Sequence, residues 1–381
     1  MQLSELRERI AQASFHPVEG GAVVYEPRSK RLFALNLTAA SVWLGLADGA
    51  SEEALATDLV SLADASPADA EAWVQQAFTS FAELLAESGP EPEPADPVTH
   101  APTFAPGTDY RLLGQTLRVD ADPAAEPLIQ SLLGELRAPA YVAATPAFWL
   151  EVRARDAGFH LRLNGEPVAE VPPPQLAAEV DKLIFERLLP QAPHFLAFHA
   201  AALKLADQLV ILPAPAGSGK TTLSAALARR GWAYNSDEMA ILDRALEWRG
   251  VPLPPCVKSE NYRLIESWYP RLVEAPEHER HGRRVRYLRI PVDQTAGRVK
   301  IVVFPRFEAT SPTDLARLDP FTGLLRLLEA CVFVPLGFEA PDVSRLLAWH
   351  AEAAYFTLTF SDADGATATL EQKLRQTLAE G

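Results

Sequence analysis

The sequence contains little cysteine. Only Cys256 and Cys331 occur among 381 residues. Two cysteines are too few for a disulfide framework or a four-ligand zinc site. So few thiols are typical of a protein that works in a reducing compartment. We therefore expect a cytoplasmic location, with neither a structural disulfide nor a zinc centre.

Long apolar runs are also missing. The first residues, MQLSELRERIAQ, have no apolar signal core, and the longest apolar stretch, FLAFHAAALKLADQLVIL, is interrupted by His199, Lys204 and Asp207. These features predict neither a signal peptide nor a membrane span. The hydrophobic content of 48% and the charged content of 22% are ordinary for a globular chain with a buried core. The length predicts two or three domains.

Positive charge is scarce, since the net charge is −15. In residues 1–100 acidic side chains outnumber basic ones by sixteen to five, which argues against a nucleic-acid partner for this part. The exception is HERHGRRVRYLR, with five arginines between His278 and Arg289. This run has two interpretations, a solvated surface loop or a segment that faces an anion.

A Pro- and acid-rich stretch, EPEPADPVTHAPTFAPG, predicts a linker at residues 91–107. It separates an N-terminal domain at 1–90 from the rest of the chain. Residues 108–195 mix strand-like pieces with a helix from about Pro174 to Leu188 and show no catalytic pattern. We expect this part to be an α+β lead-in to a nucleotide-type domain at 196–381.

The N-terminal domain combines two strands with three helices. GAVVYEP and KRLFALN predict strands joined by a turn at Pro27–Ser29. Helical patterns follow from Thr38 to Ala47, after Ser51 and after Ser66, where both serines suit the N-cap position. The last helix carries an apolar stripe that we expect in the core: Trp73, Phe78, Phe81 and Leu85. This order predicts a winged-helix-like α+β domain.

A glycine-rich loop lies in QLVILPAPAGSGKTTLSAALARRG, between an apolar strand and a helix. This context predicts a P-loop, or Walker A motif, although Ala214 takes the place of the first glycine. Backbone N–H groups of the loop would face the phosphates of ATP, Lys220 would reach the β- and γ-phosphates, and Thr221 would bind Mg²⁺. The expected nucleotide-binding residues are Ala216, Gly217, Ser218, Gly219, Lys220, Thr221 and Thr222. The alternative is a strand–helix turn without a nucleotide.

Two adjacent acids follow in WAYNSDEMAIL. We expect a second, parallel strand with Asp237 and Glu238 near its C-terminal end, the edge where such sheets bind ligands. One carboxylate could hold Mg²⁺ while the other accepts a proton. An acidic turn without a site is the alternative. The chain lacks an N-K-x-D-like motif for recognition of the guanine base, which argues against a GTPase switch.

FHAAAL, LPAPAGSGKTTLSAAL and RGWAYNSDEMAIL together resemble the C-terminal domain of the HPr kinase/phosphorylase family. They are most similar to the HPr-kinase-related branch found with peptide-modification systems. The resemblance covers roughly residues 108–381, with specific motifs only in 196–262. It implies an α/β P-loop kinase that uses ATP and Mg²⁺. It also implies that Asp237 is the base for a serine hydroxyl, that His199 lies beside it, and that Glu238 is near the metal with Thr221 and Asp237.

The chain departs from that family in three respects. Ala214 replaces a glycine, and the acidic pair is Asp-Glu where the metabolic HPr kinases have Asp-Asp. The C-terminal Arg/Gly-rich signature of phosphorolysis is missing. We therefore expect neither the reverse reaction nor HPr itself as substrate. Members of the family form oligomers, so a homo-oligomer remains open.

A second cation is expected beside the phosphoryl group, because phosphoryl transfer develops negative charge that one lysine does not neutralise. VPLPPCVKSENYRLI resembles the LK-N segment of the related branch, which makes Lys258 the candidate. A surface lysine is the alternative interpretation. An arginine from Arg280 to Arg289 is the competing candidate.

The N-terminal domain resembles the PqqD-like peptide chaperones, through GAVVYEPRSKRLFALNLTAASVWLGLADGASEEALATDL. Such domains bind a leader peptide as an added strand beside their sheet. The resemblance implies a groove formed by Leu32, Phe33, Ala34, Leu35 and the helix around Trp73. A degenerate winged helix that serves only packing is the alternative.

Together these features predict an ATP-dependent peptide or protein serine kinase of a peptide-maturation pathway. Its partner would be a precursor or carrier peptide, with no nucleic acid and no membrane involved. Two other functions stay open. One is a small-molecule kinase or NTP hydrolase whose N-terminal domain recruits a partner. The other is a non-catalytic, nucleotide-sensing adaptor that binds peptides.

Overall fold

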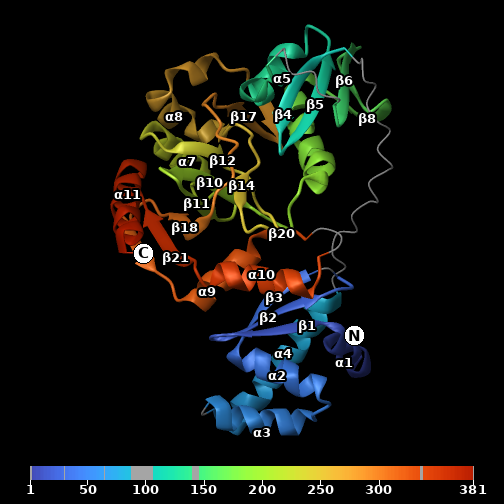
Figure 1. Ribbon diagram of the computed structural model, residues 1–381, viewed down its shortest axis with the longest axis vertical. Helices are drawn as coiled ribbons and strands as arrows, with labels where there is room; N and C mark the ends of the chain where they lie inside the picture. The colour runs from blue at the N-terminus through green and yellow to red at the C-terminus, as the bar shows by residue number, and fades with distance from the viewer. Residues whose placement is uncertain are drawn as a thin grey trace. The chain divides into compact units, whose positions relative to one another are not determined.

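The computed structural model describes residues 2–29, 31–63, 65–86, 106–139, 146–334 and 338–380. The chain forms two compact α/β units, and Figure 1 labels many of their elements. Unit 1 combines Met1–Pro92 with Leu318–Ala353, and unit 2 combines Glu93–Arg317 with Ala354–Gly381. The expected division placed all of residues 196–381 in one domain, whereas Leu318–Ala353 belong to the same compact unit as the N-terminal residues. Residues 91–105 of the expected linker lie outside the described residues.

The sheet of unit 1 has three antiparallel strands in the order β1-β2-β3, namely Ser14–Val18, Gly21–Glu26 and Arg31–Asn36. Every residue of β2 is buried. Because successive side chains of a strand point to opposite faces, both faces of this sheet must be covered. Ala22 and Val24 pack into a core cluster with Trp43 and Phe81 on one face.

Helices from two distant parts of the chain belong to unit 1. The N-terminal segment provides α1 (Leu3–Gln12), α2 (Leu37–Ala47), α3 (Glu52–Ala63) and α4 (Pro67–Ala86). The later segment provides α9 (Pro320–Glu329), β20 (Cys331–Phe333) and α10 (Ala340–His350). Helix α10 contacts β1 and β2, and α9 contacts β3.

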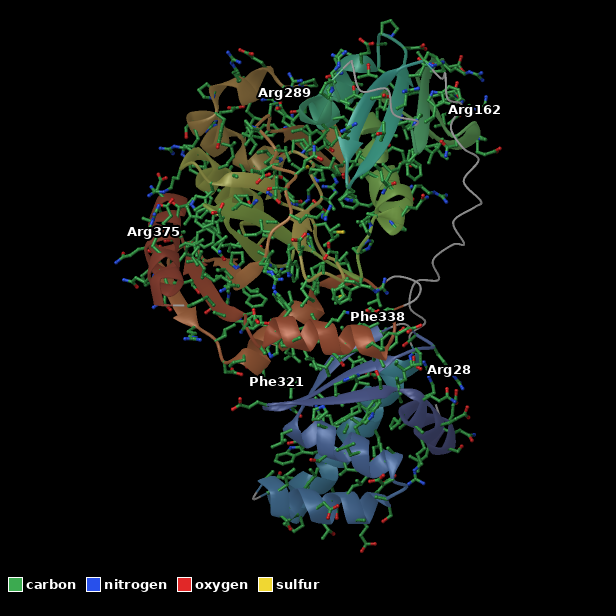
Figure 2. The ribbon with its side chains drawn as sticks, viewed as in Figure 1. Arg28, Arg162, Arg289, Phe321, Phe338 and Arg375 are labelled. Carbon is green, nitrogen blue, oxygen red and sulfur yellow. The ribbon has the colours of Figure 1, made fainter. Side chains whose placement is uncertain are left out.

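Aromatic side chains join the later segment to the sheet. The Tyr25 hydroxyl donates to the Phe338 carbonyl at 3.0 Å, and the two ring centroids are 4.8 Å apart. The Phe321 ring lies so close to the backbone of Gly21 that a Cβ there would come within 2.7 Å of it. Figure 2 labels Phe321 and Phe338 beside the sheet of unit 1. The second face of the sheet is therefore covered by residues that follow it by about three hundred positions.

The two expected serine N-caps of the N-terminal domain are confirmed, whereas the expected core stripe is confirmed only in part. The backbone N–H of Ala54 donates to Ser51 Oγ at 3.2 Å, and that of Asp69 donates to Ser66 Oγ at 3.2 Å, so both serines cap their helices. Phe81 and Leu85 are buried in the core, whereas Trp73 is 38% exposed and lies outside it. The unit is an antiparallel sheet with helices, and its winged-helix character stays a prediction.

Unit 2 begins with a five-stranded sheet in the order β4-β5-β6-β7-β8. Its strands are Thr108–Leu112, Gln115–Ala121, Phe148–Arg155, Gly158–Leu163 and Glu166–Val171. Helix α5 (Glu126–Leu133) packs on α6 (Leu176–Leu183). A π-helical turn, η3 (Ile184–Leu188), directly continues α6, so the expected helix from Pro174 to Leu188 is only partly α-helical.

The central sheet of unit 2 has six strands in the order β12-β10-β11-β18-β21-β19. Strands β11, β18 and β21 are parallel, while β10, β12 and β19 pair antiparallel with their neighbours. The bounds are Ala200–Leu205 for β10, Gln208–Pro213 for β11, Ala233–Ser236 for β12, Val299–Phe307 for β18, Asp314–Arg317 for β19 and Ala354–Phe360 for β21. The expected second strand is thus β12, which pairs with β10 and not directly with β11.

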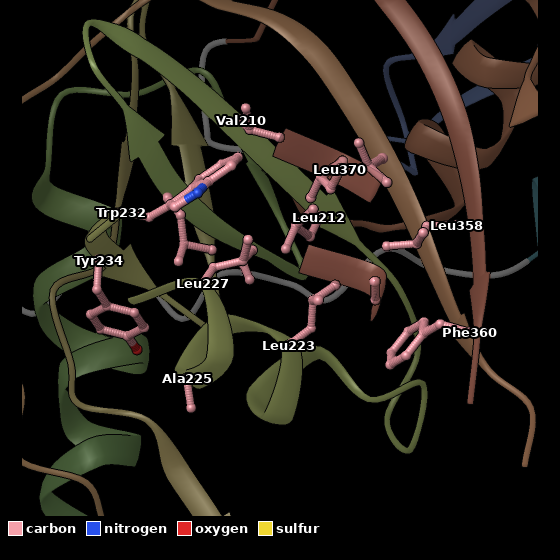
Figure 3. Packing of buried hydrophobic residues seen from close by; sticks show 14 of the residues in the cluster. Val210, Leu212, Leu223, Ala225, Leu227, Trp232, Tyr234, Leu358, Phe360 and Leu370 are labelled. Carbon is pink, nitrogen blue, oxygen red and sulfur yellow. The ribbon is translucent and has the colours of Figure 1, made fainter. Parts of the chain in front are cut away.

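Helices α7 (Lys220–Arg229) and α11 (Ala363–Glu380) pack on this sheet and on each other. Figure 3 shows Leu223 and Leu227 of α7, Leu370 of α11 and Leu212 of β11 meeting in one cluster. Burial of each such side chain stabilises the fold by roughly 1.5–3 kcal/mol. This core fixes the end of β11 relative to the start of α7, which is where the expected site lies.

Short elements complete unit 2. Strand β13 (Ala240–Leu242) pairs antiparallel with β9 (Leu196–Phe198) and β14 (Trp248–Gly250), and β17 (Arg283–Tyr287) pairs with β15 (Cys256–Lys258) and β16 (His278–Arg280). Helix α8 is Tyr262–Trp268. Short 3-10 turns are η1 (Gly134–Leu136), η2 (Pro173–Gln175), η4 (Leu189–Gln191), η5 (Ser259–Asn261) and η6 (Pro270–Glu274). Among the helices in the described part of the chain, none is long and apolar enough to cross a bilayer.

Candidate functional site

The glycine-rich loop lies between the end of β11 at Pro213 and the start of α7 at Lys220. Gly217 and Gly219 have φ values of +88° and +90°, which L-residues rarely adopt. At Gly219 a Cβ would also come within 2.9 Å of the Phe360 ring. Ala214 is not among the described residues with positive φ. The alanine in the first glycine's place is therefore compatible with this backbone.

Lys220, the first residue of α7, folds back over the loop. Its ammonium group donates to the carbonyl of Ala214, to the Pro215 carbonyl at 3.3 Å and to His199 Nε2 at 3.3 Å. Burial lowers the Lys220 pKa to about 8, although Asp237 and Glu238 favour the charged form. The ammonium is thus a buried cation at the N-terminus of a helix, where an anion would be stabilised.

His199 lies between β9 and β10, opposite the loop. Burial, helped by the Lys220 charge, lowers the pKa of its imidazole. The ring is therefore neutral at neutral pH and accepts the hydrogen bond from Lys220. The resemblance implies that His199 lies beside Asp237, whereas the hydrogen bond of the imidazole in this structure is with Lys220.

The two acids follow β12 directly. Asp237 is 5% exposed and accepts a hydrogen bond from the Tyr234 hydroxyl at 3.1 Å. Burial and then the Glu238 charge raise the Asp237 pKa to about 6, against a hydrogen bond from the Thr221 side chain. A carboxylate with a pKa near neutrality is suited to accept and release a proton. Thr221, on the first turn of α7, therefore brings the loop and the acid into contact.

Glu238 has a different partner, Arg280 at the end of β16. Arg280 Nη1 and Nη2 donate to the two Glu238 carboxylate oxygens at 3.1 and 3.2 Å. Burial, the largest single effect, would raise the Glu238 pKa, but the charge and hydrogen bonds of Arg280, together with His199 and Lys220, hold it below its ordinary value. Glu238 is therefore ionised at neutral pH. Arg280 Nη2 also lies 2.8 Å from Asp181 Oδ2.

Lys258, the expected second cation, ends β15. Burial is the main cause of the lowered Lys220 pKa, and the charge of Lys258 contributes to it. Lys258 thus lies within electrostatic range of the loop lysine. Arg280, the competing candidate, contacts Glu238 directly, whereas Arg283 and Arg284 of the same basic run have side chains that are 61% and 71% exposed.

The part of this cluster that the sequence does not suggest is Asp181. It lies on α6, and its side chain is only 6% exposed. One sequence signal could have indicated Asp181. Ala177, Asp181 and Ile184 are spaced to share one buried helix face, where a single acidic residue is unusual.

Hard oxygen donors meet at the start of α7. The Thr221 hydroxyl and the Asp237 and Glu238 carboxylates are the ligand types that Mg²⁺ prefers. No cluster of three or more His, Cys, Asp and Glu side chains with metal-binding geometry occurs among the described residues. This donor set fits Mg²⁺ held mainly by phosphate oxygens, with one or two protein ligands.

The residues expected to bind a peptide belong to unit 1. Strand β3 pairs only with β2 in the described sheet, so no described strand occupies its other edge. Leu32, Phe33 and Leu35 are buried, and Ala34 is half-buried. The side chains of β3 therefore serve the core, so a peptide that binds as an added strand would pair with its backbone edge. Trp73, on α4, is exposed.

Residues 21–84 match the family described as Coenzyme PQQ synthesis protein D (PqqD). The matched segment runs from the start of β2 to the last turn of α4. A search of curated proteins found no match. The chain therefore carries, within its N-terminal unit, a PqqD-like domain of the kind that recognises peptides in ribosomal peptide-modification systems.

Proposed function

We propose that the protein is an ATP-dependent kinase that phosphorylates a side-chain hydroxyl, most simply a serine, of a peptide captured by the PqqD-like domain. The observation that carries this proposal is the convergence of a buried lysine, two unlike carboxylates and an arginine at the glycine-rich loop. The resemblance of this segment to the HPr-kinase-related proteins supports the same activity, and the PqqD-like domain supports a peptide as the acceptor.

In this proposal each side chain has one task. Backbone N–H groups of Gly217 to Thr222 and the Lys220 ammonium would hold the phosphates, while Thr221 and Glu238 would hold Mg²⁺. MgATP supplies the phosphoryl group. Asp237 takes the proton from the serine Oγ as the new O–P bond forms and the bond to the β-phosphate oxygen breaks, leaving ADP. His199 keeps Lys220 in place, and Lys258 and Arg280 add positive charge.

The peptide-binding domain gives the reaction its acceptor. A peptide held beside β3 stays tethered to the same chain as the site, which raises its effective concentration to roughly millimolar for short flexible linkers. The site itself then requires little affinity for the acceptor.

Incubation with labelled ATP and a precursor peptide encoded beside this chain tests the proposal. We expect label on the peptide with the wild-type chain and none with Lys220→Ala. Lys300→Ala is the matched control, because Lys300 is an exposed lysine of β18. Phosphate release without a labelled acceptor would favour a hydrolase, and bound but unconverted ATP would favour a nucleotide-sensing adaptor.

A further inference from the structure

Arg280 is shared by two carboxylates that come from different parts of unit 2. Its side chain is 16% exposed, and it contacts Glu238 of the acid pair and Asp181 of α6. Asp181 Oδ2 and Arg280 Nη2 are 2.8 Å apart. The mechanism proposed above gives Asp181 no task.

Burying this group of charges is costly. Removing one partner of a buried ion pair strongly destabilises a protein, while apolar replacements of both partners often stabilise it. Arg280 faces two carboxylates: Glu238, whose pKa lies below its ordinary value, and Asp181, whose pKa burial raises to about 7 although the Arg280 charge lowers it. Such a cluster is poorly explained by stability alone, because an apolar contact would hold α6 against β16 at least as well.

Helix α6 gives Asp181 a fixed position. Leu176, Ala177, Val180 and Leu183 of this helix are buried, and the helix packs against β16, which carries Arg280. A second contact joins the residue before this helix to β16, since Gln175 Nε2 donates to Glu279 Oε1 at 3.0 Å. The π-helical turn that follows α6 is a rare conformation, found frequently at functional sites. Asp181 can therefore hold a guanidinium without moving itself.

We propose that Asp181 is the positioning residue for Arg280: it keeps Nη2 anchored while the rest of the guanidinium turns from Glu238 to the terminal phosphate of a bound nucleoside triphosphate. This inference rests on the function proposed above. Mg²⁺ would draw Glu238 oxygens away from Arg280, and the planar guanidinium can bind carboxylate and phosphate at once through different N–H groups. An arginine anchored in advance loses little conformational freedom when it meets the phosphate.

Nucleotide affinity tests this inference without an acceptor peptide. We would measure the dissociation constants of a non-hydrolysable MgATP analogue and of MgADP by calorimetry. The wild-type chain should prefer the triphosphate, and Asp181→Asn and Arg280→Ala should each lose about tenfold of that preference while MgADP binding changes little. Asp109→Asn is the matched control, because Asp109 pairs with Arg118 at 2.6 Å within the five-stranded sheet. It should keep the wild-type preference.

Chemical rescue separates positioning from general stabilisation of the fold. Guanidinium ion added to Arg280→Ala should restore triphosphate preference, and it should fail in the Asp181→Asn/Arg280→Ala double variant, which lacks the anchor. A wild-type preference in Asp181→Asn, or equal rescue in both backgrounds, would overturn the inference. If the wild-type chain binds the triphosphate but transfers no phosphoryl group, the kinase proposal is wrong. The affinity measurements on Asp181→Asn then still test whether Asp181 positions Arg280. If the wild-type chain binds no nucleotide, both proposals fall.

Discussion

Asp237 and Glu238 are neighbours in the chain but differ in their chemistry. Asp237 is buried against Tyr234 and Thr221, while Glu238 pairs with Arg280. Opposite faces of one strand would be the simplest reason for such a difference. The structure gives another, because both residues follow the end of β12 and lie in a bend. Their separate partners, more than strand alternation, distinguish the two acids.

Substituting each acid should therefore have a different effect. Asp237→Asn should retain nucleotide binding and slow phosphoryl transfer by about 10²–10⁴-fold, the usual contribution of a positioned base. Glu238→Gln should mainly change the Mg²⁺ dependence, and His199→Ala should be intermediate because Lys220 loses a partner. Single-turnover transfer at saturating nucleotide measures this, with binding followed separately. Normal transfer by Asp237→Asn together with an inactive Glu238→Gln would reverse the assignment.

His278 predicts a pH dependence of stability. It is 1% exposed, its Nε2 lies 2.8 Å from Ser131 Oγ, and burial lowers its pKa to about 4. In the unfolded chain the His278 imidazole binds a proton near pH 6.5, whereas in the folded chain it does so only near pH 4. Stability should consequently fall as the pH drops through this window, by on the order of 3 kcal/mol.

Denaturant unfolding at several pH values checks this expectation. His278→Gln should flatten the dependence between pH 6.5 and 4, whereas His281→Asn, in the neighbouring exposed turn, should keep it. An unchanged slope in His278→Gln would show that other groups cause the acid sensitivity.

At the scale of elements, the loop between β11 and α7 depends on its glycines to different degrees. Gly217→Ala should cost about 1–3 kcal/mol through its positive φ alone, since no atom lies within 4 Å of the added Cβ. Gly219→Ala combines the same strain with a clash against Phe360 and Phe307. We expect it to be clearly less stable than Gly217→Ala in thermal unfolding. Equal unfolding temperatures for the two variants would contradict the packing around Gly219.

Local sequence signals predict several elements well, because they depend on neighbouring residues only. The serine N-caps, the glycine-rich strand–loop–helix and the acids after β12 belong to this class. The basic run from His278 to Arg289 left two interpretations open, a surface loop or a segment that faces an anion. It forms the paired strands β16 and β17, where Arg283 and Arg284 are exposed and Arg280 is buried against carboxylates of the chain itself. A role toward a bound anion stays a prediction. A lone acid on an apolar helix face is the local signal for Asp181, but its pairing with Arg280 depends on a tertiary contact across about a hundred residues, which no local pattern encodes.

At the scale of the whole molecule, unit 1 is built from two distant chain segments. The strands β19 and β21 of the central sheet precede and follow Leu318–Ala353, whose helices cover the sheet of the PqqD-like domain. Deleting residues 1–90 would uncover apolar residues of α9 and α10, so we expect such a truncation to lower solubility as well as peptide use. Substitutions within the full-length chain are therefore the better probes of recognition.

The Tyr25–Phe338 hydrogen bond tests this two-segment architecture. Tyr25→Phe should destabilise the full chain by about 1 kcal/mol, because the buried Phe338 carbonyl loses its donor while the ring packing remains. Denaturant titration measures the change. A variant as stable as the wild type would indicate that Leu318–Ala353 do not pack on the sheet in solution.

The most direct test of the central claim is a single-turnover reaction between the full chain, labelled MgATP and a precursor peptide, with the modified residue located by mass spectrometry. We predict one phosphorylated hydroxyl side chain on the peptide, formed by the wild-type chain and by Lys300→Ala and absent with Lys220→Ala. Wild-type ATP turnover that leaves the peptide unmodified, or peptide labelling that persists in Lys220→Ala, would contradict the account.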